Sequence, residues 1–402
     1  MEVSLHQEEQ SQNNKVKGCI LPWIHMFGSI EGDYKLCCFS EYMSGTKVLG
    51  TSDQALLDVW NNDNYKSVRN SFLQGEIPTE CKQACYDKEK AGATSSRQSN
   101  NTKYSKYAFV QDYTVTDGSI KNKPIYLDIR FGNLCNFKCR MCGPASSTSW
   151  YKEYPYKKYK AIDNYTNNVI FWDSLPDIAS SIQDVYFGGG EPIVQDGHYK
   201  LLEFLIDRNL ASNINLSYNT NLSYSKYKKY DLEAIWSNFK NVELSPSVDG
   251  YGKKAEYVRS GLVWSKFEDN YNKFSKHIST IGAVINIYSI TSMPNLILWC
   301  KKRNVYLNGT IQINPESQSI TCLPLDVKAK LTELYTSFLT KYISILDPSE
   351  IHNINSWILY MNSSDDSHLL KEFKQFNDKL DLSRNESFIA TFPEYTSWYN
   401  NI

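Results

Sequence analysis

The chain has almost no excess charge and no long apolar segment. Its 402 residues include 43 Lys and Arg against 44 Asp and Glu, a formal net charge of −1. A balance this even gives no sign of nucleic acid or an acidic membrane as a partner. No apolar run approaches the roughly 18 residues that would span a bilayer. The first 15 residues are polar and acidic and do not resemble a signal peptide, so we expect a cytoplasmic location.

Cysteine, in contrast, is plentiful, with ten residues in the chain. The cytosol keeps thiols reduced, so clustered cysteines there indicate metal or redox chemistry rather than a disulfide framework. Cys300 and Cys322 lie within or beside apolar segments, and we expect them to be buried as small hydrophobic residues. The other eight form two groups: Cys19, Cys37, Cys38, Cys81 and Cys85, then Cys135, Cys139 and Cys142.

Length and pattern predict several domains of α/β class. Hydrophobic residues make up 41% and charged residues 22%, which is typical of a globular protein, and 402 residues suffice for two or three domains. We expect a disordered stretch at 1–16, a cysteine-rich domain with linker at 17–105, a core at 120–325 and a helical region at 326–402.

The core shows apolar strand candidates separated by helical patterns such as residues 199–210. This alternation predicts βαβ units and a parallel sheet, here a partial (β/α)6 barrel. The cysteine-rich domain contains one helical pattern at residues 52–76, and the polar residues 87–123 are expected to be a loop or linker. The predicted strands are 125–131, 184–190, 214–220, 242–250, 283–290 and 310–315.

The second cysteine group is the run Cys135-Asn-Phe-Lys-Cys139-Arg-Met-Cys142, directly after the first predicted core strand. One short loop can place three thiolates around three irons of a cubane cluster, which leaves the fourth iron open. A purely electron-carrying cluster is normally closed by four cysteines, so three indicate catalysis. The alternatives are part of a zinc site completed by a distant ligand, or an incidental grouping.

This run resembles the CxxxCxxC signature of the radical S-adenosylmethionine (AdoMet) superfamily. The resemblance implies that the open iron of a 4Fe-4S cluster binds AdoMet and that reductive cleavage yields a 5′-deoxyadenosyl radical. It also implies AdoMet contacts at polar and glycine residues that follow later strands, and at Met141, where the family often has an aromatic residue. Those residues are Gly188, Gly189, Gly190 and Glu191 of GGGEP, Asn219 and Asn221 of SYNTN, Ser247 and Asp249 of SVDG, and Arg259 of EYVRSG.

The first cysteine group resembles another known module. Twelve residues separate Cys19 from Gly32, and four more separate Gly32 from Cys37. This spacing is similar to the first half of SPASM and twitch auxiliary-cluster domains, and the pair Cys81 and Cys85 is similar to the second half. Four thiolates there would close a second iron–sulfur cluster, although a closed four-cysteine zinc site uses the same ligands. These domains usually follow the barrel, and their last pair is usually CxxC. Cys38 could replace Cys37, and we expect His25 to be packed rather than a ligand.

The resemblance implies a radical AdoMet enzyme that modifies a peptide, a protein side chain or a small molecule. Its further partners would be AdoMet and a reductant such as flavodoxin or ferredoxin. One alternative is a zinc-stabilised, non-catalytic binding module for RNA or protein. Another is a radical AdoMet fold that has lost catalysis and serves as a scaffold.

Overall fold

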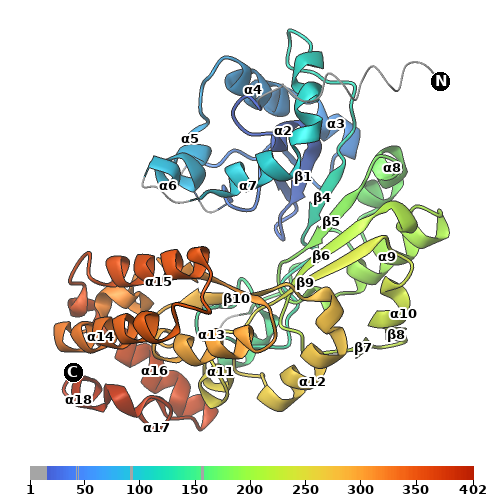
Figure 1. Cartoon of the computed structure of the whole chain (residues 1–402). Coiled ribbons are helices and arrows are strands. Elements are labelled where there is room, and N and C mark those ends of the chain that lie inside the picture. Colours follow the sequence, from blue (N-terminus) through green and yellow to red (C-terminus); the bar gives the residue numbers. More distant parts are fainter. Residues whose placement is uncertain (1–15, 42, 44, 91–93, 155–157) are drawn as a thin grey trace. The chain divides into compact units, whose positions relative to one another are not determined.

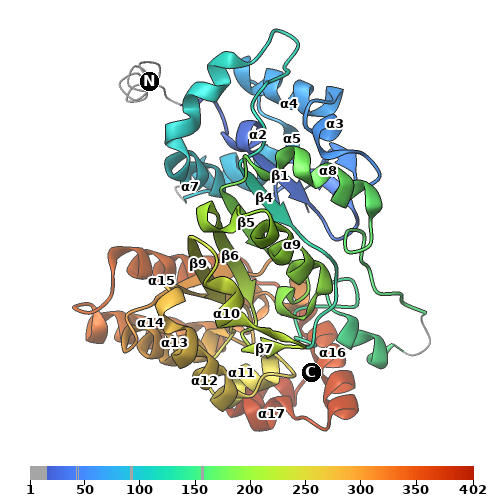
Figure 2. The same cartoon turned by 90° about the vertical axis from the view of Figure 1, so that its right-hand side faces the viewer.

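The computed structural model describes residues 16–41, 43, 45–90, 94–154 and 158–402, so the predicted disorder of 1–16 lies almost wholly outside it. The chain forms two compact units, each assembled from separate stretches of sequence. The first unit comprises Met1–Asn133, Ala161–Ser217 and Leu232–Val242. The second comprises Leu134–Lys160, Tyr218–Asp231 and Glu243–Ile402. Figures 1 and 2 label most of the helices and several of the strands.

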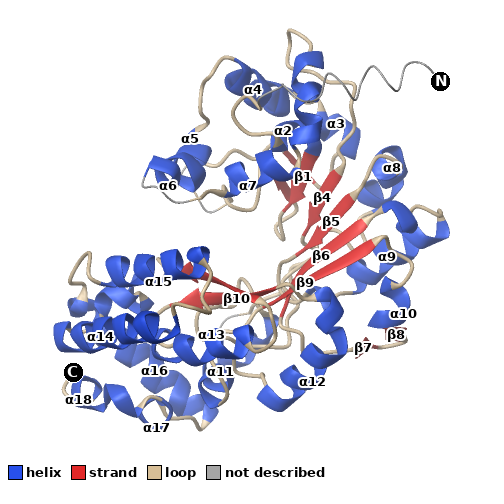
Figure 3. Cartoon of the chain, viewed as in Figure 1, coloured by secondary structure: helices blue, strands red, loops and turns tan. Residues whose placement is uncertain are grey.

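The first unit is built on a sheet in the order β3-β2-β1-β4-β5. Figure 3 shows β1, β4 and β5 as neighbouring strands. Strands β1 and β4, and likewise β4 and β5, are parallel, whereas β1–β2 and β2–β3 are antiparallel. The cysteine-rich N-terminal stretch therefore adds its strands to the same sheet as the first predicted core strand. The bounds are β1 (His25–Gly28), β2 (Asp33–Lys35), β3 (Gly50–Thr51), β4 (Tyr126–Ile129) and β5 (Asp184–Phe187).

The second unit contains a parallel pair, β10 (Thr280–Ile285) and β11 (Tyr306–Ile311). One isolated parallel bridge joins Leu244 of β9 (Asn241–Pro246) to Ile278, just before β10, and another joins Ser247, just after β9, to Gly282 of β10. The strand β6 (Asn215–Thr220) begins in the first unit and ends in the second. A short antiparallel hairpin follows it, formed by β7 (Lys226–Tyr227) and β8 (Tyr230–Asp231). The fold is thus mixed α/β with parallel strands, as the sequence predicts.

The last predicted strand, 310–315, is displaced toward the C-terminus from its true position at Tyr306–Ile311. Burial explains the difference. Val305 and Leu307 are buried, but Ile313 is 56% exposed, so the apolar residues that belong to the core come earlier than the prediction places them.

Helices fill the remainder of both units. Those of the first unit are α2 (Leu21–Ile24), α3 (Leu56–Trp60), α4 (Asp63–Leu73), α5 (Thr79–Cys81), α6 (Asp87–Lys90), α7 (Ser96–Lys103), α8 (Val169–Ala179), α9 (Asp196–Asp207) and α10 (Leu232–Trp236). Those of the second are α11 (Lys253–Val258), α12 (Trp264–Phe274), α13 (Met293–Lys301), α14 (Leu325–Tyr342), α15 (Pro348–Met361), α16 (Leu370–Arg384), α17 (Phe388–Thr391) and α18 (Thr396–Tyr399). In the described ranges no helix has the length and apolar character needed to cross a membrane.

Side-chain caps explain two errors of the helix prediction. The single helix predicted at 52–76 is two helices, because the Asn62 side chain accepts a hydrogen bond from the Tyr65 N–H and starts α4 anew. The predicted linker contains the helix α7, which begins at a capping box formed by Ser95 and Gln98. Polar composition alone was therefore a poor guide to this segment.

Candidate functional site

Four cysteines of the first group, which the sequence spreads over 67 positions, line one cavity in the first unit. Cys19 precedes α2, Cys37 follows β2, and Cys81 ends α5. Cys85 lies in a π-helical turn at residues 82–86, four positions after Cys81. Residues four apart on a helix lie on one face, which is why a CxxxC pair can serve where related domains have CxxC. All four cysteines are buried.

Burial and mutual repulsion favour the protonated form of the Cys19, Cys37 and Cys81 thiols. Burial raises the pKa of Cys19, Cys37 and Cys81, and neighbouring sulfurs of the group raise each of them further. Thiolates are the metal-binding form of cysteine, so an ionised set here needs positive charge close by. Iron or zinc would supply that charge, and the four thiols of the lining are chemically suitable ligands for either.

Cys38 points to a different environment from Cys37. It is absent from the cavity lining, and its thiol hydrogen bonds to the Asp128 carboxylate. Burial raises the pKa of Asp128 to about 6. The structure therefore brings Cys37, rather than Cys38, to the other three cysteines.

His25 is packed against this polar cluster and does not line the cysteine cavity. Its Nε2 lies 3.9 Å from Asp128 Oδ2, and its ring centroid lies 4.4 Å from that of Tyr126. Burial lowers the pKa of His25 to about 3, so the imidazole is neutral at physiological pH.

Besides Leu21, Leu36, Ser40 and Ala84, two polar residues of α7 line the cysteine cavity, and the sequence interpretation did not include these two. They are Ser96 and Arg97 at the start of α7, within the segment predicted to be a linker. A capping box followed by an arginine was the available signal, because it marks an ordered helix start.

The second cysteine group lies on one loop of the second unit. Cys139 is buried, Cys135 is half-buried and Cys142 is exposed. The thiols of Cys139 and Cys142 share a hydrogen bond, which lowers the pKa of Cys139 and raises that of Cys142. The Cys142 N–H also donates to the Cys139 carbonyl at 3.0 Å, so a tight turn holds the two together.

The EYVRSG segment fastens this loop through its backbone. The Lys138 N–H donates to the Ser260 carbonyl at 3.0 Å, and the Arg140 N–H donates to the Val258 carbonyl at 2.8 Å. Arg259 lies between Val258 and Ser260 in the chain and approaches the cysteines, with its Nη1 3.9 Å from Cys139 Sγ. After the hydrogen bond from Cys142 and the opposing effect of burial, its positive charge is a further cause of the lowered pKa of Cys139.

Asp249 holds Arg259 in place. Its Oδ2 lies 2.7 Å from Arg259 Nε, and its Oδ1 accepts a hydrogen bond from the Val284 N–H at 2.7 Å. The Asp249 side chain has no exposed surface. Its observed role is to orient an arginine toward the cysteines.

Asn221 is likewise engaged with the loop. Its Nδ2 donates to Asn136 Oδ1 at 2.9 Å, and its Oδ1 accepts from the Ser223 N–H and hydroxyl. Asn219, two residues earlier at the end of β6, is exposed. Ser247 is half-buried, and its N–H donates to the Thr220 carbonyl at 2.8 Å. Met141 is also half-buried.

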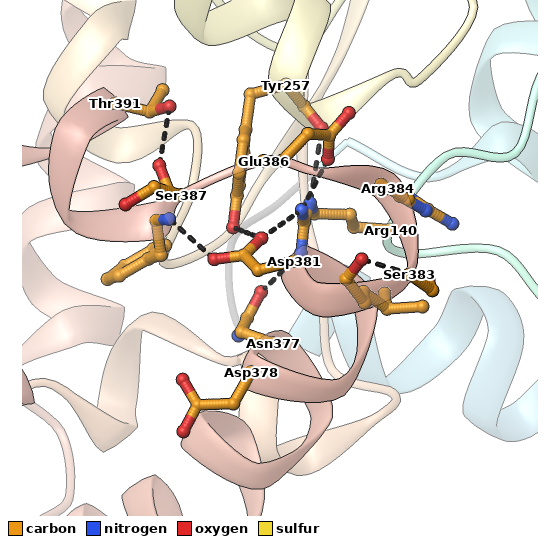
Figure 4. Close-up of polar contacts among 12 residues, drawn as sticks. Arg140, Tyr257, Asn377, Asp378, Asp381, Ser383, Arg384, Glu386, Ser387 and Thr391 are labelled. Carbon is orange, nitrogen blue, oxygen red and sulfur yellow. Dashed lines mark hydrogen bonds and ion pairs between the residues drawn. The ribbon is translucent and has the colours of Figure 1, made fainter.

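Arg140, inside the CxxxCxxC run, links the loop to the C-terminal helices (Figure 4). Its side chain is fully buried and donates to Asn377 Oδ1 at 3.0 Å, Asp381 Oδ1 at 2.5 Å and Glu386 Oε2 at 2.6 Å. Its guanidinium also stacks on the Tyr257 ring, 3.6 Å from the centroid. The sequence interpretation assigned Arg140 no role, because its three side-chain hydrogen-bond partners lie more than 230 positions away.

The GGGEP turn lies in the first unit, after β5. The Gly190 N–H donates to the Gly132 carbonyl at 3.1 Å. Gly189 has φ = +103°, and a Cβ there would come 3.1 Å from the same carbonyl oxygen. The buried Glu191 accepts a hydrogen bond from the Ile193 N–H at 3.2 Å. This turn therefore requires glycine at 189 and exposes its backbone there. Gly188, in contrast, is buried.

Among the residues that the structure describes, no three His, Cys, Asp or Glu side chains are arranged to hold a single metal ion. A cubane cluster is larger than one ion and separates its ligating sulfurs more widely. The arrangement of the described side chains therefore bears on a single-ion zinc site and does not test an iron–sulfur cluster.

Comparison with known proteins gives one family match. Residues 19–86 match the model of SPASM, an iron–sulfur cluster-binding domain. No curated protein sequence matches the chain. A matching solved structure is that of Streptococcus suis SuiB bound to precursor peptide SuiA, with 15% identity over 79% of this chain and 70% of that chain. Its TM-score of 0.36 is too low to support an argument about activity.

The matched residues include all four cysteines of the first-unit cavity. The second cysteine group follows β4 on a loop with the CxxxCxxC spacing. Residues 19–86 are thus similar to an iron–sulfur cluster-binding domain, and the second group keeps the spacing that the sequence analysis singled out.

Proposed function

We propose that the protein is a radical AdoMet enzyme. The observation that carries the proposal is the loop with Cys135, Cys139 and Cys142, which offers three thiols for a four-iron cluster. Of these three cysteines, Cys142 is exposed. When bound, the cluster and AdoMet would together supply a 5′-deoxyadenosyl radical that abstracts a hydrogen atom from the substrate.

Residues of this chain would prepare the loop for that cluster. Arg259 places a positive charge beside Cys139 and favours its thiolate. Asn221 and the backbone of residues 258–260 hold the loop from two sides. In the same proposal the methionine end of AdoMet is received by the exposed Gly189, the half-buried Gly190, and the buried Gly188 and Glu191. Asn219, Asn221, Ser247, Asp249, Met141 and Arg259 are its further contacts.

The four-cysteine cavity would hold a second, closed cluster for electron transfer. Its full set of buried thiols supports this assignment, because a closed site keeps AdoMet and solvent away from the irons. The partial (β/α)6 barrel for residues 120–325 is part of the proposal, supported by the parallel pairs β4–β5 and β10–β11.

The substrate class that we propose is a peptide, a protein side chain or a small molecule. The reductant would be a flavodoxin or ferredoxin. We place the reaction in the cytoplasm, where thiols remain reduced. SuiB, in the solved structure named above, is bound to a precursor peptide.

The test replaces Cys135, Cys139 and Cys142 by Ala together, with Cys300→Ala as a control at a buried cysteine outside both groups. After anaerobic reconstitution, we expect the triple variant to lose about half of its iron, since one of two clusters is removed. It should form no 5′-deoxyadenosine from AdoMet and dithionite, whereas the control should match the wild type. Unchanged iron and AdoMet cleavage in the triple variant would refute the proposal, and bound zinc without iron would favour the binding module.

A further inference from the structure

Helix α7 adds a charged group to the cysteine cavity from outside the region that matches the SPASM family. The match ends at residue 86, whereas α7 spans Ser96–Lys103. Arg97, in its first turn, lines the cavity with the four cysteines. The family resemblance therefore says nothing about this arginine, and its role must be read from its contacts.

Arg97 is fixed by three kinds of contact. Its guanidinium pairs with the Glu89 carboxylate through two nitrogens, one of them Nε at 2.9 Å from Oε1. Its Nη1 donates to the Gly18 carbonyl at 2.7 Å, directly before Cys19. Its Cζ lies 4.5 Å from the centroid of the Tyr86 ring, directly after Cys85. The side chain is 17% exposed, so this cation is mostly withdrawn from water.

The ion pair has a definite orientation toward the cysteines. Arg97 lines the cavity, and Glu89 does not. The pair thus places its positive end at the cavity beside Cys19, while Ser95 and Gly18 help to hold it. In a poorly solvated site such a fixed charge acts more strongly than it would in water.

We propose that Arg97 is a positioning residue that raises the reduction potential of the auxiliary cluster. The inference rests on the proposed function, because it requires an iron–sulfur cluster at these four cysteines. Reduction adds one negative charge to the cluster, and a nearby positive charge stabilises that form. Net charge and hydrogen bonds around the sulfurs are among the factors that set the potential of such clusters.

A raised potential suits a cluster that accepts electrons. A substrate radical that loses one electron to the oxidised cluster and one proton to water becomes a closed-shell product. The cluster returns to its oxidised form by passing that electron to an external one-electron carrier protein. The chain thus uses α7 to bias its auxiliary cluster toward oxidation of the substrate.

The experiment uses the full-length chain with Cys135, Cys139 and Cys142 replaced by Ala, so that one cluster remains. The midpoint potential is measured by redox titration with electron paramagnetic resonance. In Arg97→Met the ratio of reduced to oxidised cluster at a fixed potential should fall at least tenfold, which is 59 mV for one electron. Glu89→Gln should raise that ratio, because it removes the opposing charge and leaves Arg97.

Two further variants separate charge from support of the fold. Arg97→Lys keeps the charge, so its potential should lie nearer to the wild type than that of Arg97→Met. Lys103→Met is the matched control. Lys103 lies on the same helix, pairs with Asp184 at 3.5 Å and is absent from the cavity lining, so its loss should leave the potential unchanged.

The outcomes distinguish this inference from the proposed function. If the background variant holds no iron, the auxiliary cluster itself is refuted, and the inference with it. If iron is present but Arg97→Met and Glu89→Gln leave the potential unchanged, only the inference fails. If Arg97→Met loses its cluster, the potential of Glu89→Gln decides the question. An upward shift of that potential supports the role of Arg97, and a downward shift or no shift overturns it.

Discussion

Replacing Arg140 by Met should loosen the C-terminal helices and the cysteine loop together. Methionine keeps an apolar chain of similar length but removes every hydrogen bond of the guanidinium. Breaking a buried ion pair by removing one partner costs about 3–5 kcal/mol, because the other charge stays buried and unpaired. Arg140 has no exposed side-chain surface, so it belongs to this class.

The structure places the cost near the lower end of that range. Asp381 is 14% exposed and keeps hydrogen bonds from the Tyr257 hydroxyl at 2.8 Å and the Phe388 N–H at 2.6 Å. Glu386 is 24% exposed, and water can replace its lost partner in part. Asn377 keeps the Tyr288 hydroxyl as a donor at 2.9 Å. We therefore expect a loss of about 3 kcal/mol.

Native-state amide hydrogen exchange of α16 is the suitable assay, because it reports local opening and does not require the whole chain to unfold in one step. A loss of about 3 kcal/mol corresponds to roughly hundredfold faster exchange, at 1.4 kcal/mol for each factor of ten. The matched control is Lys374→Met on the same helix. Its pair with Asp378 is partly exposed, so it should change exchange by only a fewfold.

Exchange in Arg140→Met that stays within a fewfold of the wild type would refute this reasoning. It would mean that the buried network contributes no more than a surface ion pair. Iron content provides a second readout. Because Arg140 lies between two of the proposed ligands, a loosened loop should also lose iron faster to a chelator than the control does.

Three other predictions concern the first unit. Gly189→Ala should weaken AdoMet binding at least tenfold in equilibrium dialysis, because its Cβ would lie 3.1 Å from the Gly132 oxygen and φ is +103°; unchanged affinity would place AdoMet elsewhere. Cys37→Ala should lose the iron of the auxiliary site in the variant that lacks the other cluster, whereas Cys38→Ala should retain it; the reverse result would exchange their roles. Asp128 has a pKa raised to about 6 by burial, so the native state holds its proton longer than the unfolded state does. This group therefore destabilises the fold as pH rises from about 4 through 6. The urea midpoint of Asp128→Asn should rise relative to that of the wild type between pH 4 and pH 7. A difference between the two midpoints that does not change with pH would contradict the assignment.

Spacing along the chain was sufficient to identify both groups of cysteines. Cys135, Cys139 and Cys142 are close in sequence, so a short loop must bring them near one another whatever the rest of the fold does. The parallel strands were also predictable, because apolar runs such as residues 184–187 alternate with amphipathic helices. The prediction of strands and helices failed at residues 306–311, at the break between α3 and α4 and in α7, where burial and side-chain caps decided the outcome.

The choice between Cys37 and Cys38 shows the limit of this reasoning. Cys37 and Cys38, adjacent residues after β2, face different surroundings, and only the folded chain decides which one meets Cys19 and Cys81. Sequence spacing resolves positions several residues apart, but it does not resolve the direction of neighbouring side chains.

By itself, then, the sequence determined the parts of this protein that local spacing controls: the CxxxCxxC loop, the four-cysteine set and the alternation of strands and helices. Only the tertiary structure decided which residues surround those parts. Arg97 reaches Cys19 from a helix more than 70 positions away, and Arg140 meets Asp381 across 241 positions. Contacts between such distant residues depend on how whole elements pack, and a single sequence carries no local signal for them.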